Sequence, residues 1–335
     1  MAALSRDDVA AAADREGVVE IWSTTDLDRV KDLLADFRRL HPRIKVVYSD
    51  VHGSDLQTDF LRAARGGGGT ADLLWSSAMD LQIKLVNDGH AATYRSPEAA
   101  NLPDWAKWKD QAWGITAEPI VIVYNKRLIA RDQVPTSHIG LRKFLESGPA
   151  DGRRAVATYD ISRSAVGYLY LSQDEQASSD VWRLVRAMGR DRLKLYTSAE
   201  DILRDVSAGS AAIGYNIVGS YALDEMSRHA DLGVIMPQDY TLVMSRIAMI
   251  PNRARHPAAA RLFLDFLLSR SGQRRLAEHH ITPARSDVII PAQLQTPAVP
   301  LRAIRVGPAL LVTNDRLTRS HFLALWRQSL SPSTL

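Results

Sequence analysis

The chain has 335 residues, of which 46% are hydrophobic, 24% charged and 7% aromatic, and it contains no cysteine. This length accommodates about two domains. The lack of cysteine excludes a disulfide-stabilised scaffold, a zinc ribbon and a cysteine nucleophile, so a metal site would need oxygen or imidazole ligands. No apolar run approaches the roughly 18 residues of a membrane-spanning helix, which excludes an integral membrane protein.

The net charge of +4 belongs to the C-terminal part of the chain. From Arg253 onward there are 12 arginines and four acidic residues, so the preceding part is slightly acidic. No nucleic-acid-binding module accompanies these arginines, and we expect a solvated basic surface and no nucleic-acid partner. The N-terminus has neither the basic start nor the apolar core of a signal peptide. Either the protein is cytosolic or an export signal has been removed; composition leaves both open.

Three strand–helix units occupy the first ninety residues. Apolar runs predict strands at 17–22, 44–48 and 71–75, each followed by apolar residues at helical spacing. The predicted helices end, in order, at His41-Pro42, at Gly66–Gly69 and at Gly89. This alternation predicts a largely parallel sheet covered by helices, an architecture that binds ligands beyond the carboxyl ends of its strands.

The middle of the chain repeats the pattern. Strands are predicted at 155–158 and 211–216, and a helix follows each of them. Two extended links, Glu118–Asn125 and 233–250, connect this section to the rest of the chain. An amphipathic helix follows Pro257, and a last amphipathic stretch surrounds 322–326.

Catalytic signatures are missing from the sequence. It contains no Gly-x-Ser-x-Gly elbow, no His-Glu-x-x-His, no phosphate loop and no Gly-x-Gly-x-x-Gly after a strand. We therefore expect a protein that is not an enzyme, with no catalytic residue, no resident metal and no cofactor.

Hydroxyl side chains recur where predicted strands meet predicted helices. They are Ser23, Thr24, Thr25, Ser76, Ser77, Ser162 and Ser164. Each alone is explained as a helix N-cap. Together they favour an anion site, because helix N-termini present unpaired N–H groups and hydroxyls add donors. Arg163 can either clamp a phosphate or carboxylate or lie on the surface of a first helical turn.

Several segments resemble a known family. They are Val19-Glu20-Ile21-Trp22-Ser23-Thr24-Thr25-Asp26, Ala71-Asp72-Leu73-Leu74-Trp75-Ser76-Ser77-Ala78-Met79-Asp80, Val123-Tyr124-Asn125-Lys126, Ala211-Ala212-Ile213-Gly214-Tyr215-Asn216 and 259–273. In order and spacing they are similar to the bacterial extracellular solute-binding proteins of ABC transporters, especially the ferric-ion- and organophosphate-binding group. The resemblance extends over about 17–285.

This resemblance implies an α/β, two-lobed periplasmic-binding-protein fold of type II, each lobe a mostly parallel sheet flanked by helices. Lobe 1 would comprise 17–118 and 245–335, and lobe 2 would comprise 119–244. Hinge strands near Ala117–Tyr124 and Ile235–Met244 would join them, with the ligand cleft between the lobes. It further implies a monomer in the periplasm that delivers its solute to an ABC permease in the inner membrane.

The ligand class depends on the tyrosines. Iron-binding members of the family resemble one another in an adjacent Tyr-Tyr pair, whereas this chain has Tyr215-Asn216, with Tyr221 the next tyrosine. The broken pair argues against Fe(III), which prefers several anionic oxygens. We expect a small anionic organic solute such as a phosphorylated sugar, phosphoglycerate or a phosphonate. The alternatives are a ferric-iron carrier that uses Tyr215 and a ligand-binding sensory module.

The residues expected to bind this solute come from both lobes. They are Ser23, Thr24, Thr25, Ser76, Ser77, Glu118, Asp160, Ser162, Arg163, Ser164, Tyr215 and Asn216. The hydroxyls and nearby backbone amides can saturate phosphate oxygens without a fixed cation. Asp160 can accept hydrogen bonds from ligand hydroxyls, although a carboxylate in a first helical turn is favoured by the helix dipole alone.

Overall fold

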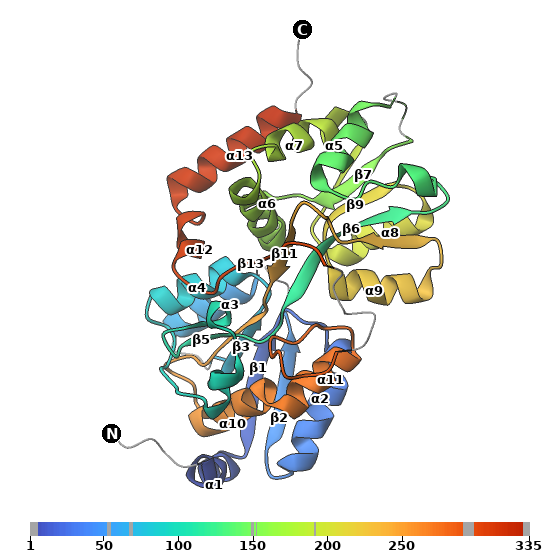
Figure 1. Ribbon diagram of the computed structural model, residues 1–335. Helices are drawn as coiled ribbons and strands as arrows, with labels where there is room; N and C mark the ends of the chain where they lie inside the picture. The colour runs from blue at the N-terminus through green and yellow to red at the C-terminus, as the bar shows by residue number, and fades with distance from the viewer. Residues whose placement is uncertain are drawn as a thin grey trace. The chain divides into compact units, whose positions relative to one another are not determined.

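The computed structural model describes residues 6–51, 55–66, 70–148, 151, 153–190, 192–290 and 298–330. The chain divides into two compact units (Figure 1). Unit 1 comprises the described residues as far as Ala117, those of 245–290, and Arg305–Leu311; unit 2 comprises the described residues of 118–244, 298–304 and 312–330. The chain thus passes between the units at Ala117–Glu118, at Met244–Ser245 and again towards its C-terminus.

Unit 1 is built on a six-stranded sheet in the order β2-β1-β3-β12-β5-β4. Its strands are β1 (Val18–Ser23), β2 (Lys45–Asp50), β3 (Leu73–Ser76), β4 (Lys107–Trp108), β5 (Ala112–Gly114) and β12 (Ile247–Met249). Its helices are α1 (Arg6–Glu16), α2 (Leu27–Leu40), α3 (Asp55–Arg65), α4 (Met79–Asn87), α10 (Pro257–Leu268) and α11 (Arg270–Glu278), with short 3-10 helices at Pro97–Asn101 and Asp104–Ala106. The predicted strand–helix order is confirmed through α4; Gly67–Gly69 of the expected glycine loop lie outside the described residues.

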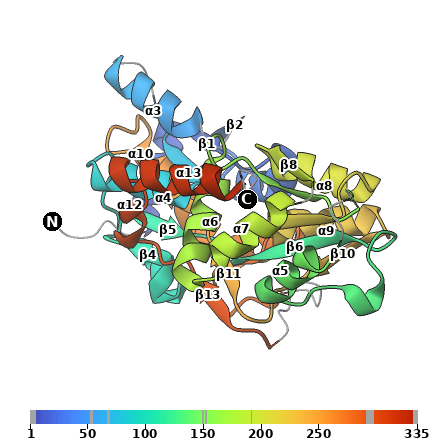
Figure 2. The ribbon, with the colours of Figure 1, turned by 90° about the horizontal axis from the view of Figure 1, so that it is seen from above.

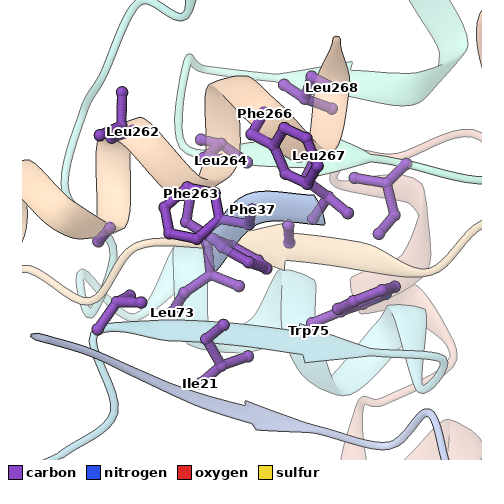
Figure 3. Close-up of a cluster of buried hydrophobic side chains, with 14 of the residues drawn as sticks. Ile21, Phe37, Leu73, Trp75, Leu262, Phe263, Leu264, Phe266, Leu267 and Leu268 are labelled. Carbon is purple, nitrogen blue, oxygen red and sulfur yellow. The ribbon is translucent and has the colours of Figure 1, made fainter. Parts of the chain in front are cut away.

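The core of unit 1 forms between this sheet and the apolar helix α10. Phe37 of α2 packs edge-on against Phe263, with ring centroids 5.0 Å apart, above Ile21 and Leu73 of the sheet (Figure 3). The N-terminus of α10 is held by α1, because the Glu16 carboxylate accepts hydrogen bonds from the Ala258 N–H (3.1 Å) and the Ala259 N–H (2.8 Å). This satisfies helix N–H groups that have no partner within the helix.

Unit 2 is built on a second sheet in the order β13-β11-β6-β9-β7-β8, with β10 also paired to β6. Its strands are β6 (Glu118–Asn125), β7 (Val156–Tyr159), β8 (Leu193–Tyr196), β9 (Ile213–Val218), β10 (Leu232–Ile235), β11 (Thr241–Met244) and β13 (Leu301–Ala303). Its helices are α5 (His138–Glu146), α6 (Ala165–Ala177), α7 (Val181–Arg190), α8 (Ala199–Ala208), α9 (Gly219–Arg228) and α13 (Arg316–Leu330), with a 3-10 helix at Arg131–Gln133. The short helix α12 (Ala309–Val312) lies where the chain enters this unit for the last time.

Both sheets are mixed, which corrects the expectation of mostly parallel sheets. The parallel pairs β1–β2, β1–β3, β7–β8 and β7–β9 come from strand–helix units. Strands on the links between the units enter the sheets in the opposite direction, so β12 is antiparallel to β3 and β6 is antiparallel to β9 and β11. Two strands connected by a helix run parallel. A strand that enters from the other unit has no such helical connection, so it can pair antiparallel.

The assignment of all residues 245–335 to lobe 1 is wrong for the C-terminal helix. In α13, Phe322 packs edge-on against Trp182 of α7, with centroids 4.9 Å apart, and against Tyr168 of α6 at 5.2 Å. Phe322 and Trp326 are buried in the core of unit 2. Burial of these two aromatic side chains explains why the chain returns to unit 2. Among the described helices, none has the length and apolar character needed to cross a lipid bilayer.

Candidate functional site

The hydroxyls of unit 1 meet at one edge of its sheet. β1 and β3 are parallel neighbours, with Ser23 opposite Trp75, so the residues that follow each strand emerge side by side. The Thr24 and Ser77 hydroxyl oxygens are 3.0 Å apart, and the Ser77 N–H donates to Thr24 Oγ1 at 2.9 Å. The structure therefore brings together the two groups of hydroxyls that the sequence placed fifty residues apart.

Ser23 and Ser76 occupy equivalent positions at this edge. Ser23 Oγ accepts the N–H of Thr25 at 3.0 Å, and Ser76 Oγ accepts the N–H of Ala78 at 3.1 Å. Both serines are buried. A hydroxyl that accepts one hydrogen bond retains its own proton to donate, so these turns hold the oxygens in place without using the O–H protons.

Arg246 adds a cation that the sequence analysis did not select. β12 is antiparallel to β3, with Ile247 opposite Ser76, so the residue before β12 lies at the same sheet edge. Arg246 is 1% exposed; its guanidinium donates to Thr25 Oγ1 at 2.9 Å, and its backbone N–H donates to Thr116 Oγ1 at 2.8 Å. A buried guanidinium bonded to a hydroxyl at this sheet edge can bind a carboxylate or phosphate.

A signal for Arg246 was present in the sequence. It is a charged residue within the apolar stretch Leu242-Val243-Met244-Ser245-Arg246-Ile247-Ala248-Met249-Ile250. Arginine is almost never fully buried unless it has partners, so an arginine inside such a stretch indicates a specific role. Asp80, in the first turn of α4, is buried as well and provides a carboxylate in the same segment as Ser76 and Ser77.

In unit 2 the polar side chains of the loop before α6 form hydrogen bonds mainly within that loop and with the first turn of α6. The Asp160 carboxylate accepts the Ser162 N–H at 3.0 Å and the Ser162 hydroxyl at 2.6 Å. Ser164 is the N-cap of α6 and accepts the Gly167 N–H at 3.3 Å, whereas Ser162 and Arg163 are exposed. Glu118, at the start of β6, is fully buried and accepts a hydrogen bond from the Ser220 hydroxyl.

Tyr215 and Asn216 lie in a bulge of β9 and not in a regular strand. Between the pairs Val121–Ile217 and Val123–Gly214, two residues of β9 oppose the single Ile122 of β6, and Asn216 has φ of 63°. Neighbouring side chains of a regular strand point to opposite faces, but a bulge removes that alternation. As a result the Tyr215 hydroxyl (2.8 Å) and the Asn216 amide (2.7 Å) donate to the same oxygen of Asp174 on α6.

Asp174 is the centre of a buried polar network in unit 2. Its other oxygen accepts the Tyr240 hydroxyl at 3.0 Å and lies 4.0 Å from His138 Nε2. His138 is stacked on Tyr240 and is 2.8 Å from Asp239 through Nδ1. These contacts tie α5, α6, β9 and the residues before β11 together.

The pKa values of this network follow from burial and its partners. Burial raises the pKa of Asp174 and raises the pKa of Tyr215 well above its usual range, the latter with help from the neighbouring Asp174 charge. Burial also opposes the charge of Asp239, but the hydrogen bond and electrostatic attraction of His138 outweigh it and lower the pKa of Asp239 to about 2. Tyr215 is therefore held as a neutral phenol that donates inward. From the sequence, we expect Tyr215 and Asn216 to face a ligand. In the structure both side chains are instead buried against Asp174.

Comparisons with known proteins agree with this architecture. The sequence profile of the bacterial extracellular solute-binding proteins matches residues 32–300. The crystal structure of the substrate binding protein of the ABC transporter from Agrobacterium tumefaciens is 35% identical, with a TM-score of 0.87 over 94% of each chain. The chain belongs to the bacterial extracellular solute-binding proteins, which confirms the family and the two-lobed α/β fold expected from the sequence.

More distant structures share the fold. Iron-bound HitA from Pseudomonas aeruginosa is 17% identical, with a TM-score of 0.74 over 93% of this chain and 99% of that one. The periplasmic binding protein AfuA from Actinobacillus pleuropneumoniae, with fructose-6-phosphate bound, is also 17% identical, with a TM-score of 0.75 over 95% of this chain and 99% of that one. No curated protein matches the sequence. Among the described residues, no group of three or more His, Asp or Glu side chains is placed to hold a metal ion.

Proposed function

We propose that this protein is the periplasmic solute-binding component of an ABC importer and that it binds a small anionic organic solute of the phosphorylated-sugar, phosphoglycerate or phosphonate type. The observation that carries the proposal is the buried Arg246 guanidinium on Thr25, at the edge where the hydroxyls that follow β1 and β3 meet. A phosphate ester offers several acceptor oxygens, which a guanidinium and several O–H and N–H donors can satisfy together.

The role in transport is supported by family membership. The Agrobacterium tumefaciens protein, 35% identical over nearly the whole chain, is described as the substrate binding protein of an ABC transporter. By analogy, an ABC permease in the inner membrane is the proposed partner. AfuA, with fructose-6-phosphate bound, is a precedent on this fold for the phosphorylated ligand class.

Binding is proposed to proceed by closure of the two lobes. Unit 1 supplies Arg246 and the hydroxyls, and the exposed Arg163 is the candidate donor from unit 2, since the Ser162 hydroxyl, although exposed, already donates to Asp160. A ligand that satisfies donors of both units favours the closed state by its difference in affinity for the two states. Iron is disfavoured as the ligand because Tyr215 donates its proton to Asp174, whereas Fe(III) requires a phenolate.

A thermal-shift panel tests the ligand class. Glucose 6-phosphate, fructose 6-phosphate, 3-phosphoglycerate, a phosphonate, a dicarboxylate, inorganic phosphate, ferric citrate and the neutral sugars are each added to the protein. A ligand at 100 times its dissociation constant stabilises the folded protein by about 2.7 kcal/mol, so a true ligand raises the melting temperature clearly. We expect a phosphate ester or phosphonate to do so. Stabilisation by a neutral sugar or by ferric iron, with none from the phosphorylated compounds, would overturn the proposal.

A further inference from the structure

Two helices of unit 2 have an unusual charge. α7 carries Arg183, Arg186 and Arg190, and neither α7 nor α13 contains an aspartate or a glutamate. The arginines of α13 are Arg316, Arg319 and Arg327. Every other described helix of eight or more residues that contains an arginine or lysine also contains a carboxylate. The positive charge of α7 and α13 is therefore uncompensated within the helices themselves.

These two helices lie next to each other (Figures 1 and 2). Trp182, near the start of α7, contacts Phe322, and Gly189, near its end, lies against Leu330, so the helices run in the same direction. Their apolar faces are buried, which leaves the arginines of α7 exposed at a spacing of three and four residues, on one stripe. The exposed arginines of the pair are Arg183, Arg186 and Arg190 on α7 and Arg316 and Arg327 on α13, and we call them the α7–α13 face; Arg319 is half-buried over the ring of Tyr168.

Few carboxylates neutralise this face. Arg183 lies 3.8 Å from Asp180, but that carboxylate already binds Arg142 at 2.6 Å. The side chains of Arg186 and Arg316 make no ion pair or hydrogen bond within the part of the chain that the structure describes. By contrast, exposed arginines on α2 and α3 pair with carboxylates one turn away, Arg39 with Asp36 and Arg62 with Asp59.

Exposed apolar side chains adjoin the basic face. Leu317, next to Arg316, is 79% exposed, and Val312 at the end of α12 is 63% exposed. Arginine binds phosphate groups through paired N–H donors, and apolar side chains beside basic residues are typical of segments that lie on a membrane surface. An acidic protein surface would also bind the arginines, but its binding would not explain the exposed apolar side chains of Leu317 and Val312.

We propose that the α7–α13 face, with Leu317 and Val312 at its edge, docks on an anionic phospholipid surface. The guanidinium groups bind lipid phosphates, and the two apolar side chains enter the interfacial region. No helix has to insert, since the attraction is electrostatic and weakens as the salt concentration rises. This inference rests on surface residues of unit 2 and is independent of the solute and of its binding site.

Vesicle co-sedimentation of the full chain tests the proposal. The probes are vesicles of phosphatidylcholine alone and vesicles of phosphatidylcholine mixed with an equal part of phosphatidylglycerol, at low and high salt. We expect the protein to sediment only with the phosphatidylglycerol vesicles, at low salt. The double variant Arg186→Glu with Arg316→Glu should bind at least about tenfold more weakly, because each arginine near an anionic surface contributes roughly a factor of five. Leu317→Ser should weaken binding without any change of charge.

A control variant separates this face from a general charge effect. Arg39→Glu with Arg62→Glu makes the same change in net charge on exposed positions of α2 and α3 and should keep wild-type sedimentation. The proposal is overturned if wild-type protein fails to bind phosphatidylglycerol vesicles, if the control loses as much binding as the α7–α13 variant, or if sedimentation is equal with both vesicles. Variant-sensitive binding of polyglutamate without binding to vesicles would assign the face to an acidic protein instead. Unchanged melting temperatures show that the variants are folded.

Discussion

The strand ends of the two units use polar side chains in opposite ways. In unit 1, Ser23 and Ser76 accept backbone N–H groups two residues further on, which fixes their oxygens without using their O–H protons. In unit 2, the side chains of Tyr215 and Asn216 donate hydrogen bonds to Asp174 inside the unit. Residues of similar polarity therefore form the proposed ligand site in one unit and a buried structural network in the other.

The backbone accounts for this difference. β1 and β3 end as regular parallel neighbours, so the residues after them emerge together at the sheet edge. β9 is interrupted by a bulge, which turns two successive side chains towards the same buried carboxylate. Similar polar sequences at strand ends thus have different roles according to the local register.

The largest effect is expected from Asp174→Ala. It removes a buried acceptor of hydrogen bonds from Tyr215, Asn216 and Tyr240 and leaves their donors unsatisfied. We expect a loss of about 3–5 kcal/mol in the free energy of unfolding, measured by urea denaturation. Gln176→Ala, an exposed position on the same helix, is the control and should change it by less than about 0.5 kcal/mol. A loss below about 1 kcal/mol for Asp174→Ala would mean that the network does not hold unit 2 together.

Tyr215→Phe tests whether the Tyr215 hydroxyl stabilises the fold or contacts the ligand. It removes one donor to Asp174 and should cost about 1–3 kcal/mol of stability. Affinity for the phosphorylated solute, measured by calorimetry below the melting temperature, should change less than about twofold. A loss of affinity of tenfold or more would place Tyr215 in the ligand site and remove the contrast between the two units.

Asp239→Asn tests the same network by its pH dependence. The pKa of Asp239 in the folded protein is lowered to about 2, so its charge stabilises the fold above the unfolded pKa of about 3.9. Since the group is partly accessible, we expect wild type to exceed the variant by about 1–2 kcal/mol near neutral pH and to lose this advantage as the pH falls towards 2. Urea denaturation at a series of pH values measures it. A difference that stayed constant with pH would exclude titration of Asp239 as its cause.

The double variant Ser76→Ala with Ser77→Ala tests the hydroxyls of unit 1. Loss of their two donors should weaken binding of the solute about thirtyfold, because each hydrogen bond contributes about 1 kcal/mol. Stability should fall by no more than about 1–2 kcal/mol, the value of a helix cap. Calorimetric titration and a melting curve provide both numbers. Unchanged affinity would remove these serines from the site.

Sequence patterns identified most of the elements that position the site. The apolar runs at 17–22 and 71–75 correspond to β1 and β3, and their parallel pairing brings Thr24 and Ser77 together as expected. The contributions from long-range packing could not be predicted. Arg246 joins this edge only because β12 pairs antiparallel with β3, about 170 residues earlier in the chain.

The same limit applies in unit 2. A period of two places Tyr215 and Asn216 on opposite faces, but the bulge opposite Ile122 places both on Asp174. Asparagine tolerates the positive φ better than most residues, which was the one local signal at this position. α13 belongs to unit 2 because Phe322 and Trp326 are buried beside α7. The residues around α13 in the sequence do not indicate this packing.

The binding of an anion by Arg246 is tested most directly by titration calorimetry of wild type and Arg246→Lys with the phosphate ester that gives the largest thermal shift. The lysine keeps the charge but cannot reproduce the paired donors of the guanidinium. Arg285→Lys, at a buried arginine of unit 1 that pairs with Glu98 and Asp287, is the matched control. We predict at least about tenfold weaker binding for Arg246→Lys and wild-type affinity for the control. Equal affinity for all three proteins, each shown to be folded, would contradict a role for Arg246 in binding the anion.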